Sequence, residues 1–526
     1  MSSKVRIALC GALILYACTA TDNGAPPHRS EEAVPEHMQE GFNGARDDDG
    51  TGVDAGDMND FTVKMSTGDE SDMGESLLDQ GGDDMPRDLV LARAMHLAHD
   101  AYLYGYPAVL MDVTREMFLA NDVPENTLVH LRQIPDARFR AVVRPNTDTL
   151  YSTAWLDLSE GPVVLTAPAI DPDERFYMFA LLDAWTNAFA APGTRHNNGA
   201  ASVYAIVAPG QALTLPEGMI PIEAPTNTVW LIGRIEVFGA EDVSEVTSIQ
   251  DRFGLMTLED YRAGVETDNK APDYAKLSGE PTPPELVARM DTEEFFARLT
   301  RILETNPPPA RDDKQLEQLA EIGLTVGNDF DLQALTPNRI EALEAAPAKA
   351  RNFIDTTLEV MSETRTWAPG HRIPLGDYDT NYLIRAVVAR IGLGANLNED
   401  ARYINARIDS RGDRLEGSSR YVIHFDAEAL PPVRAFWSLT VYDQDGYLLP
   451  GVLTSTVGSN TALHENEDGS IDIWLQQLPP SEPSMRSNWL PIAPGPFELT
   501  MRMYWPEEAA LDGMWRPPAI TPRPER

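Results

Sequence analysis

The chain has only two cysteines among its 526 residues, Cys10 and Cys18, and both lie within the first twenty positions. The rest of the chain therefore offers no thiol for a disulfide framework, a thiolate metal site or a cysteine nucleophile. Basic residues are also scarce, because 82 Asp and Glu oppose 42 Lys and Arg and give a formal net charge of −40. Such acidity argues against binding to nucleic acid and against electrostatic docking onto anionic lipid.

Several catalytic and cofactor signatures are missing as well. The sequence has no glycine-flanked serine elbow, no His-Glu-x-x-His pair, no phosphate-binding Gly-rich loop before a lysine and no dinucleotide fingerprint. We therefore predict neither a cofactor nor a metal ion. The absence of these motifs does not decide whether the protein is an enzyme, because carboxylates and arginines could still support a reaction.

The N-terminus carries a targeting segment. Residues 1–17 combine two early basic residues with a short apolar run, which is typical of a secretory signal peptide and too short to cross a bilayer as a mature helix. Residues 15–18, Leu-Tyr-Ala-Cys, resemble the bacterial lipobox, which implies lipidation of Cys18. Thr19 stands where an aspartate would retain a lipoprotein at the inner membrane, so the resemblance implies the outer membrane. The alternative is an ordinary signal peptide with an incidental cysteine.

Residues 18–86 predict a disordered acidic tether. Over residues 19–88 there are 19 acidic and 4 basic residues and few large apolar groups. Such a segment cannot bury enough apolar surface to offset its loss of conformational entropy. The acidic run at residues 47–54 is similar to a calcium loop, but Met58 stands where the bidentate glutamate belongs.

Residues 87–265 predict an N-terminal domain in which helices precede a β-sandwich. Helical spacing of apolar residues predicts one helix at 89–106, ended by Pro107, and another at 111–118. β-branched and aromatic runs separated by Pro, Gly and Asn predict short strands after Val142. These strands are expected at residues 163–165, 176–182, 203–207 and 229–237.

Residues 266–395 predict a helical connecting region. Asp291 and Glu294 form a capping box at the start of an amphipathic segment. Thr336 and Pro337 are typical of the first positions of another helix, and residues 379–392 predict a third.

Residues 396–510 return to strand patterns and predict a second antiparallel β-sandwich. The expected strands lie at residues 421–425, 436–442, 471–475 and 497–503. Asp445 and Gly446 predict a hairpin turn. Residues 511–526 would form a Pro-rich tail. We find no internal sequence repeat.

Six short motifs spread over residues 88–506 carry a family resemblance. In the first half they are AYLYGYP at 101–107, NTDTLYS at 146–152 and DAWTN at 183–187. In the second half they are FWSLTVYD at 436–443, NWLP at 488–491 and PFELTMRMYWP at 496–506. Together they resemble a bacterial family that pairs domain of unknown function 1254 with domain of unknown function 1214. The resemblance implies a mainly β fold with two jelly-roll-like sandwiches joined by helices, and it implies no particular reaction.

One polar stretch and one later segment contain the candidate site. The ligand-binding candidates are Arg144, Asn146, Asp148, Tyr151, Asp183, Trp185 and Asn187. Asp148 and Asp183 are also the candidate catalytic residues, because buried carboxylates can separate into an acid and a base. Residues two apart on an extended chain face the same side, so Asn146 and Asp148 are expected to project together. The alternative is structural, with the Asp and Asn side chains capping turns and Arg144 pairing with Asp148.

Two functions of different classes follow. The first is a lipid-anchored envelope protein that binds a small-molecule or carbohydrate ligand, or that serves as an interaction module, with homo-oligomers as one option. The second is an envelope hydrolase or lyase that acts at a carboxylate and arginine pocket. Convergence of Asp148, Asp183 and Arg144 in one enclosed pocket would favour the enzyme.

Overall fold

The structure is a computed structural model of the chain. It describes residues 87–140, 142–267, 281–362, 367, 374–452 and 455–523. The predicted signal peptide, the lipidation site at Cys18 and the acidic tether lie outside the described residues. Within the described part, no helix is long and apolar enough to span a membrane.

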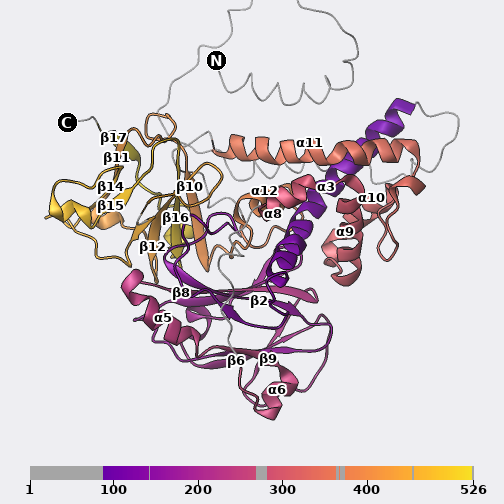
Figure 1. Cartoon of the computed structure of the whole chain (residues 1–526), viewed down its shortest axis with the longest axis horizontal. Helices are drawn as coiled ribbons and strands as arrows, with labels where there is room; N and C mark the ends of the chain where they lie inside the picture. The colour runs from indigo at the N-terminus through magenta and orange to yellow at the C-terminus, as the bar shows by residue number, and fades with distance from the viewer. Residues whose placement is uncertain are drawn as a thin grey trace, which may run out of the picture. The chain divides into compact units, whose positions relative to one another are not determined.

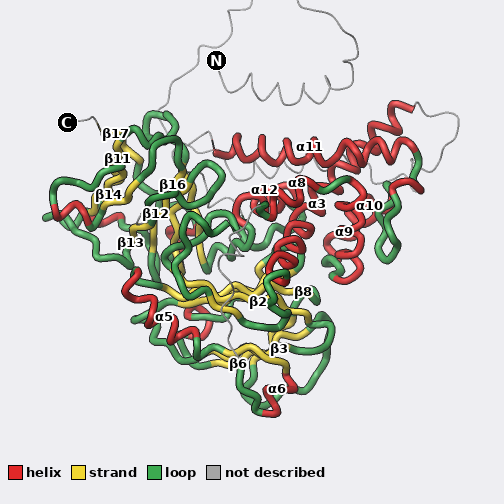
Figure 2. Tube along the Cα trace, in the orientation of Figure 1, coloured by secondary structure: helices red, strands yellow, loops and turns green. Residues whose placement is uncertain are grey.

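The first β-sandwich consists of two sheets that share one apolar core. The first sheet contains β1 (Val129–His130), β2 (Thr149–Asp157), β8 (Thr228–Glu236), β4 (Tyr177–Asp183) and β5 (Ala188–Ala190), in that spatial order. The second contains β7 (Ile220–Glu223), β6 (Ser202–Val207), β3 (Val163–Ala167) and β9 (Gly254–Thr257). The four strands expected here from the sequence are present (Figures 1 and 2).

The second β-sandwich is built in the same way around its own core. One sheet contains β10 (Ala401–Ala406), β16 (Glu498–Tyr504), β12 (Trp437–Tyr442) and β13 (Thr456–Gly458). The other contains β15 (Trp489–Pro491), β14 (Ile471–Gln476), β11 (Arg420–Phe425) and β17 (Ile520–Arg523). The predicted Pro-rich tail thus contributes an edge strand, a position at which a proline such as Pro522 is tolerated.

The two sandwiches have the same strand topology. The order β2-β8-β4-β5 in the first corresponds to β10-β16-β12-β13 in the second, and β7-β6-β3-β9 corresponds to β15-β14-β11-β17. Each of the strands β2 to β9 therefore matches the strand eight numbers later, whereas β1 has no counterpart among the described strands. Neighbouring strands that are antiparallel in the first sandwich have antiparallel counterparts in the second, and the parallel pair has a parallel counterpart. The fold is an internal structural repeat, which the sequence comparison within the chain did not detect.

The expected fold class is confirmed as mainly β with helical segments, but the sheets are not purely antiparallel. β6 pairs with β7 in parallel, and the corresponding strands β14 and β15 are also parallel. In both cases the parallel strand lies at a sheet edge. The loops between these strands are too long to be tight hairpins, so they can return the chain to the starting end of the sheet.

One sheet of each sandwich, which we call inner sheets 1 and 2, faces the other sandwich. Inner sheet 1 contains β2, β8 and β4, and inner sheet 2 contains β10, β16 and β12. Their outward faces share an apolar cluster in which Phe176 lies 5.5 Å from Tyr504 and 6.2 Å from Phe436, measured between ring centroids. Both faces of each inner sheet are therefore buried, and the residues of β8 and β16 are buried almost throughout.

The helix at residues 87–119 and the helices at residues 283–392 form a separate apolar cluster. The longer helices of the described chain are α3 (Arg87–Leu119), α5 (Val243–Gln250), α9 (Thr292–Thr305), α10 (Asp313–Glu321), α11 (Pro337–Ser362) and α12 (Tyr382–Gly392). The shorter ones are α4 (Thr194–Asn197), α6 (Leu258–Ala263), α8 (Pro283–Arg289) and α13 (Glu508–Leu511). The 3-10 turns are η2 (Ala240–Asp242), η3 (Ala310–Asp312), η4 (Leu332–Ala334), η6 (Ala427–Ala429) and η7 (Pro483–Arg486). The predicted N-cap at Asp291 is confirmed by its bond from the Glu294 amide.

The predicted end of the first helix at Pro107 is wrong. α3 continues through Pro107 as a single helix to Leu119. An internal proline removes one backbone hydrogen bond and costs roughly 3 kcal/mol. Residues 101–111 of α3 are all buried, and Tyr102 stacks on Phe295 of α9 with ring centroids 4.2 Å apart. The free energy gained from this packing outweighs the local tendency of proline to end a helix. As a result, α3 continues as far as the inner sheets.

We predict that Gly233→Ala destabilises the first sandwich. A Cβ atom at Gly233 would lie 2.7 Å from the ring of Phe179, which is fully buried and stacked on Phe253. Overpacking of this kind costs about 1–3 kcal/mol of unfolding free energy, measurable by urea denaturation. Gly392→Ala is the control, because a Cβ there meets no atom within 4 Å. Equal stability of the two variants would contradict the packing described here.

Candidate functional site

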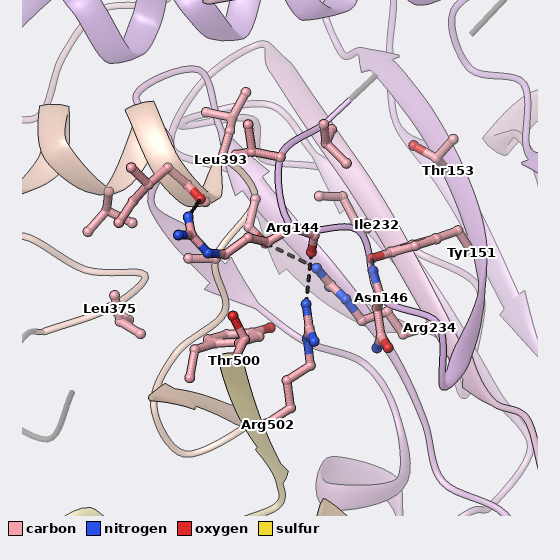
Figure 3. A pocket seen from close by; sticks show the side chains of 18 of the residues that line it. Arg144, Asn146, Tyr151, Thr153, Ile232, Arg234, Leu375, Leu393, Thr500 and Arg502 are labelled. Carbon is pink, nitrogen blue, oxygen red and sulfur yellow. Dashed lines mark hydrogen bonds between the residues drawn. The ribbon is translucent and has the colours of Figure 1, made fainter. Parts of the chain in front are cut away.

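A cavity of about 150 Å³ lies between the two inner sheets. The C-terminal end of α12 and the residues that follow it form a further wall, and the end of α3 contributes Phe118. Four pairs of matching positions in the two sheets line this cavity, which we call the central cavity. They are Tyr151 and Tyr403, Thr153 and Asn405, Ile232 and Thr500, and Arg234 and Arg502. The internal repeat thus supplies both sides of the cavity (Figure 3).

Two tyrosine–arginine pairs define the polar side of the cavity. Tyr151 of β2 lies directly opposite Arg234 of β8, and Tyr403 of β10 lies directly opposite Arg502 of β16. Each guanidinium carbon lies over its tyrosine ring, at 5.6 Å from the centroid in the first pair and 5.9 Å in the second. Cross-strand register therefore fixes the same two side chains at the same place in each sandwich.

Both arginines are buried and are held by neutral groups. Arg234 donates to Asn396 Oδ1 at 3.1 Å and to the Gly394 carbonyl at 3.2 Å. Arg502 donates to the Thr440 hydroxyl at 2.9 Å, the Tyr442 hydroxyl at 2.6 Å and the Arg144 carbonyl at 2.8 Å. No Asp or Glu lines the central cavity among the residues that the structure describes.

Three tyrosine hydroxyls face the same region as acceptors. Tyr151 Oη accepts from the Asn146 amide at 2.8 Å, Tyr504 Oη accepts from Asn146 Nδ2 at 2.5 Å, and Tyr403 Oη accepts from Asn396 Nδ2 at 2.5 Å. Burial raises the pKa of Tyr403 and Tyr504, so both phenols keep their protons. Each hydroxyl can then donate that proton to a further acceptor.

The remaining walls are mostly apolar. Their apolar residues are Phe118, Leu131, Phe139, Val142, Val143, Trp230, Ile232, Leu375, Val388, Ile391 and Leu393. A concave, mostly apolar space with a few converging polar groups is the usual form of a small-molecule site.

Arg144, the first residue of the predicted site stretch, lines the cavity and has an unusual backbone. Its φ of 49° lies in the left-handed region, and its amide donates to the Gly446 carbonyl at 2.7 Å. Its guanidinium donates to the Ile391 carbonyl at 2.9 Å and to Glu498 at 2.5 Å. The expected alternative pairing with Asp148 is therefore wrong. Glu498 of β16 takes that place and joins the stretch to inner sheet 2.

Asn146 and Tyr151 also line the central cavity, whereas Asp148 does not. The amide of Asp148 donates to Asn146 Oδ1 at 2.9 Å, so the two side chains take different roles within one turn. Burial raises the pKa of Asp148, and the nearby Arg502 charge acts in the opposite direction. Asp148 thus lies behind the polar side of the cavity, close enough to influence Arg502.

Asp183, Trp185 and Asn187 lie away from the central cavity. Asp183 accepts from the Trp185 amide at 2.9 Å, the Asn187 amide at 2.8 Å and Asn187 Nδ2 at 2.9 Å. The Trp185 indole is buried in the helical cluster and donates to the Asn306 carbonyl. The side chains thus close the turn between β4 and β5, as the structural alternative expected.

The second sandwich repeats this turn after β12. Asp443 accepts from the Asp445 amide at 3.0 Å and the Tyr447 amide at 2.8 Å. Its own amide donates to the Tyr447 carbonyl, just as the Asp183 amide donates to Asn187. The predicted turn at 445–446 is therefore the counterpart of the DAWTN motif. Occurrence in both sandwiches identifies the arrangement as part of the fold.

The expected convergence of Asp148 and Asp183 does not occur. Asp148 immediately precedes Thr149, which pairs with Glu236 at one end of β8, while Asp183 pairs with Val229 near the other end. Seven residues of strand separate these partners, or roughly 23 Å. The two carboxylates cannot act together on one small substrate.

Arg234, Arg502, Tyr403 and Tyr504 line the cavity but were not among the sequence candidates. A signal for the arginines was present. Arg234 interrupts the mostly apolar strand β8, and Arg502 alternates with the apolar residues of β16, while arginine is rarely buried without a partner. The tyrosines gave no such signal, because an aromatic residue in a strand is ordinary core.

Comparison with known proteins supports the two-domain organisation. Residues 125–257 match the model of a protein of unknown function, DUF1254, and residues 400–508 match that of a second, DUF1214. The chain pairs DUF1254 with DUF1214. The family resemblance seen in the sequence motifs is thereby confirmed. The DUF1254 match contains the strands of the first sandwich, and the DUF1214 match contains all strands of the second except β17.

One solved structure shows a similar fold, and a second shows a weaker likeness. The VPA0106 protein from Vibrio parahaemolyticus is similar with a TM-score of 0.59 and 22% identity, over 82% of this chain and 100% of that one. An uncharacterised protein from Burkholderia cenocepacia has a TM-score of 0.37 and 14% identity, over 89% of this chain and 96% of that one. No curated protein matches the chain.

We predict that Asp183 makes the stability of this DUF1254–DUF1214 chain fall as the pH rises from about 4 to 7. Burial raises the pKa of Asp183 from 3.8 to about 6, although its hydrogen bonds act in the opposite direction. In this range the folded state binds more protons than the unfolded state, so unfolding free energy decreases with pH. The loss amounts to about 3 kcal/mol, at about 1.4 kcal/mol per pKa unit.

The variant Asp183→Asn removes this titration. Denaturant unfolding at pH 4, 5.5 and 7 measures the unfolding free energy of both proteins. As the pH rises across this range, the native protein should lose about 3 kcal/mol of unfolding free energy relative to the variant. A gap that is independent of pH would contradict the burial of the Asp183 carboxylate.

Proposed function

We propose that this protein binds a small organic ligand in the central cavity and is held in the cell envelope by a lipid on Cys18. The ligand part is supported by one observation above all. Two matching tyrosine–arginine pairs, contributed by different domains, face one cavity whose other walls are mostly apolar. Burial of an arginine costs free energy unless its charge is compensated. Apolar residues at both positions would be sufficient for core packing alone.

The size of the cavity sets the size of the ligand. A volume of about 150 Å³ is comparable to that of an engineered apolar cavity in another protein that admits benzene. The ligand is therefore of the size of a single ring or a short branched chain. A carbohydrate is disfavoured, because a sugar would bring many hydroxyl groups against apolar walls.

The alternative of a hydrolase or lyase receives less support. General acid–base catalysis needs a titratable group within hydrogen-bond reach of the reacting atom. Asp148 and Asp183, the candidate catalytic residues, do not line the central cavity, and Asp183 is engaged in its own turn. The arginines and tyrosines that do line the cavity suit recognition of a polar group.

We predict that ring-sized compounds bind in the central cavity and that Gly392→Leu prevents it. Gly392 lines the cavity, and a Cβ atom added there meets no atom within 4 Å, so we expect leucine to extend into the space without displacing the backbone. Saturation-transfer NMR with toluene, benzyl alcohol, benzylamine and benzoate measures binding. At least one of these should bind the native protein and lose its signal in the variant.

The matched control is Leu478→Ala, a change at a side chain that is 73% exposed and does not line the cavity. It should leave the NMR signals unchanged. Failure of all four compounds to bind, or equal binding to native protein and Gly392→Leu, would reject the central cavity as the ligand site.

The anchor is tested separately. We predict that Cys18→Ser moves the protein from the membrane fraction to the soluble fraction, because a lipid chain contributes about 0.8 kcal/mol per buried methylene. Fractionation and immunoblotting of cells that express each form provide the measurement. A variant that remains in the membrane fraction would show that Cys18 is not the attachment point.

A further inference from the structure

We propose that the ligand of the central cavity is a small apolar monocarboxylate, held at its carboxylate by Arg234 and Arg502. This inference rests on the proposed binding function and specifies the chemistry of the ligand. The two guanidinium groups come from different domains and approach one another across the cavity (Figure 3). Each lies close enough for its charge to act on the other.

The balance of charge around the cavity favours an anion. Arg144 pairs with Glu498, which is shared with Arg407. Arg234 and Arg502 have only neutral hydrogen-bond acceptors among the contacts described above. The charge of Asp148 acts on both arginines, but a single carboxylate cannot balance two buried cations. At least one positive charge is therefore left without a counterion in the low-dielectric interior, where such a charge is most unfavourable.

The donors are arranged for a planar group with two acceptor atoms. A guanidinium offers a fork of donors that matches a carboxylate, and two such forks face one space here. The hydroxyls of Tyr151, Tyr403 and Tyr504 already accept hydrogen bonds from amide groups. Their protons are left to be donated, so arginines and tyrosines together act as a set of donors without a competing acceptor.

The residues in the other walls of the cavity determine which chemical group can carry the carboxylate of the ligand. Most of this surface is apolar and includes Phe118, Phe139 and Ile391. Its polar members Thr153, Asn405 and Thr500 are neutral, and Thr500 donates to Asn405 Oδ1 at 2.7 Å. The Trp230 N–H already donates to the Thr153 hydroxyl at 2.9 Å. A dicarboxylate, a phosphate ester or an amino acid would place a second polar group against this surface. A carboxylate on one ring or one short branched chain leaves no polar group unpaired.

The test compares four probes on the native protein by isothermal titration calorimetry. The probes are benzoate, benzyl alcohol, benzylamine and acetate. We expect benzoate to bind at least about tenfold more tightly than benzyl alcohol, because hydrogen bonds to a charged group are the stronger ones. Benzylamine should not bind, since its cation would face two others. Acetate should bind more weakly than benzoate, because it lacks the apolar body.

The variant Arg234→Met separates recognition from stability. It should weaken benzoate binding at least about tenfold while leaving benzyl alcohol nearly unaffected. It should also raise the melting temperature of the ligand-free protein, because a buried cation without a counterion is replaced by an apolar side chain of similar length. A purely structural arginine would give the opposite change in melting temperature.

Two further variants keep the test decisive. Arg175→Met is the matched control, because Arg175 is also buried but pairs with Asp242 outside the cavity. It should leave benzoate affinity unchanged. If Arg234→Met fails to fold, Tyr151→Phe carries the test and should reduce benzoate affinity without affecting benzyl alcohol.

The outcomes distinguish the two proposals. Equal affinity for benzyl alcohol and benzoate, abolished by Gly392→Leu, would overturn the carboxylate inference and leave the binding function intact. Acetate that binds as tightly as benzoate would overturn the apolar part of the inference. If no probe binds, the proposed function fails together with the inference.

Discussion

Burial of two like-charged guanidinium groups between facing sheets is the constraint on which the centre of this structure depends. Arg234 and Arg502 are each buried, and each is bonded to carbonyl, amide or hydroxyl oxygens. Withdrawing a cation from water costs several kcal/mol even after relaxation. Neutral acceptors reduce this cost without removing the charge. The surroundings are therefore organised around the arginines: residues 394–396 hold one, and the Arg144 backbone holds the other.

The internal repeat explains how such a centre arises from two separate domains. Because both sandwiches have one topology, the same ladder position in each presents a tyrosine beside an arginine to the space between them. The repeat is not exact in chemistry. Trp155 and Trp230 stack in the first sandwich with ring centroids 4.9 Å apart. The matching positions in the second hold the ion pair of Arg407 and Glu498. Arg144 also pairs with Glu498. This chemical difference between the two sandwiches therefore fixes the segment around Arg144, which crosses between the domains.

Much of the fold could be predicted from the sequence, because local patterns determine it. Strands such as Tyr177–Asp183 and Ile471–Gln476 follow from β-branched and aromatic runs, and the Asp291 cap follows from its spacing to Glu294. Pro107 was misjudged because the packing that keeps α3 intact involves residues nearly two hundred positions away. The repeat was not detected in the sequence because a shared topology determines which positions are apolar, but it does not determine which residue occupies each position.

The candidate site was predicted in part for a related reason. Arg144, Asn146 and Tyr151 were found because polar and aromatic side chains lie together in the sequence, and they do line the central cavity. Their partners Arg234, Tyr403 and Arg502 come from strands far along the chain, and only tertiary pairing brings them near. No local pattern encodes which face of an apolar strand meets another domain.

The carboxylates show why a shifted pKa by itself does not identify a catalytic group. Burial raises the pKa of Asp183 to about 6, a value at which a carboxylate could serve as a general acid or base near neutral pH. Yet its oxygens accept three hydrogen bonds from the turn that it closes, and Asp443 closes the matching turn of the other sandwich. The shift is thus a consequence of a buried turn. The groups that do face the central cavity are arginines, tyrosines and amides, which bind a charge but do not exchange protons readily at neutral pH. This arrangement of side chains is consistent with the proposed selection of a ligand by charge and size.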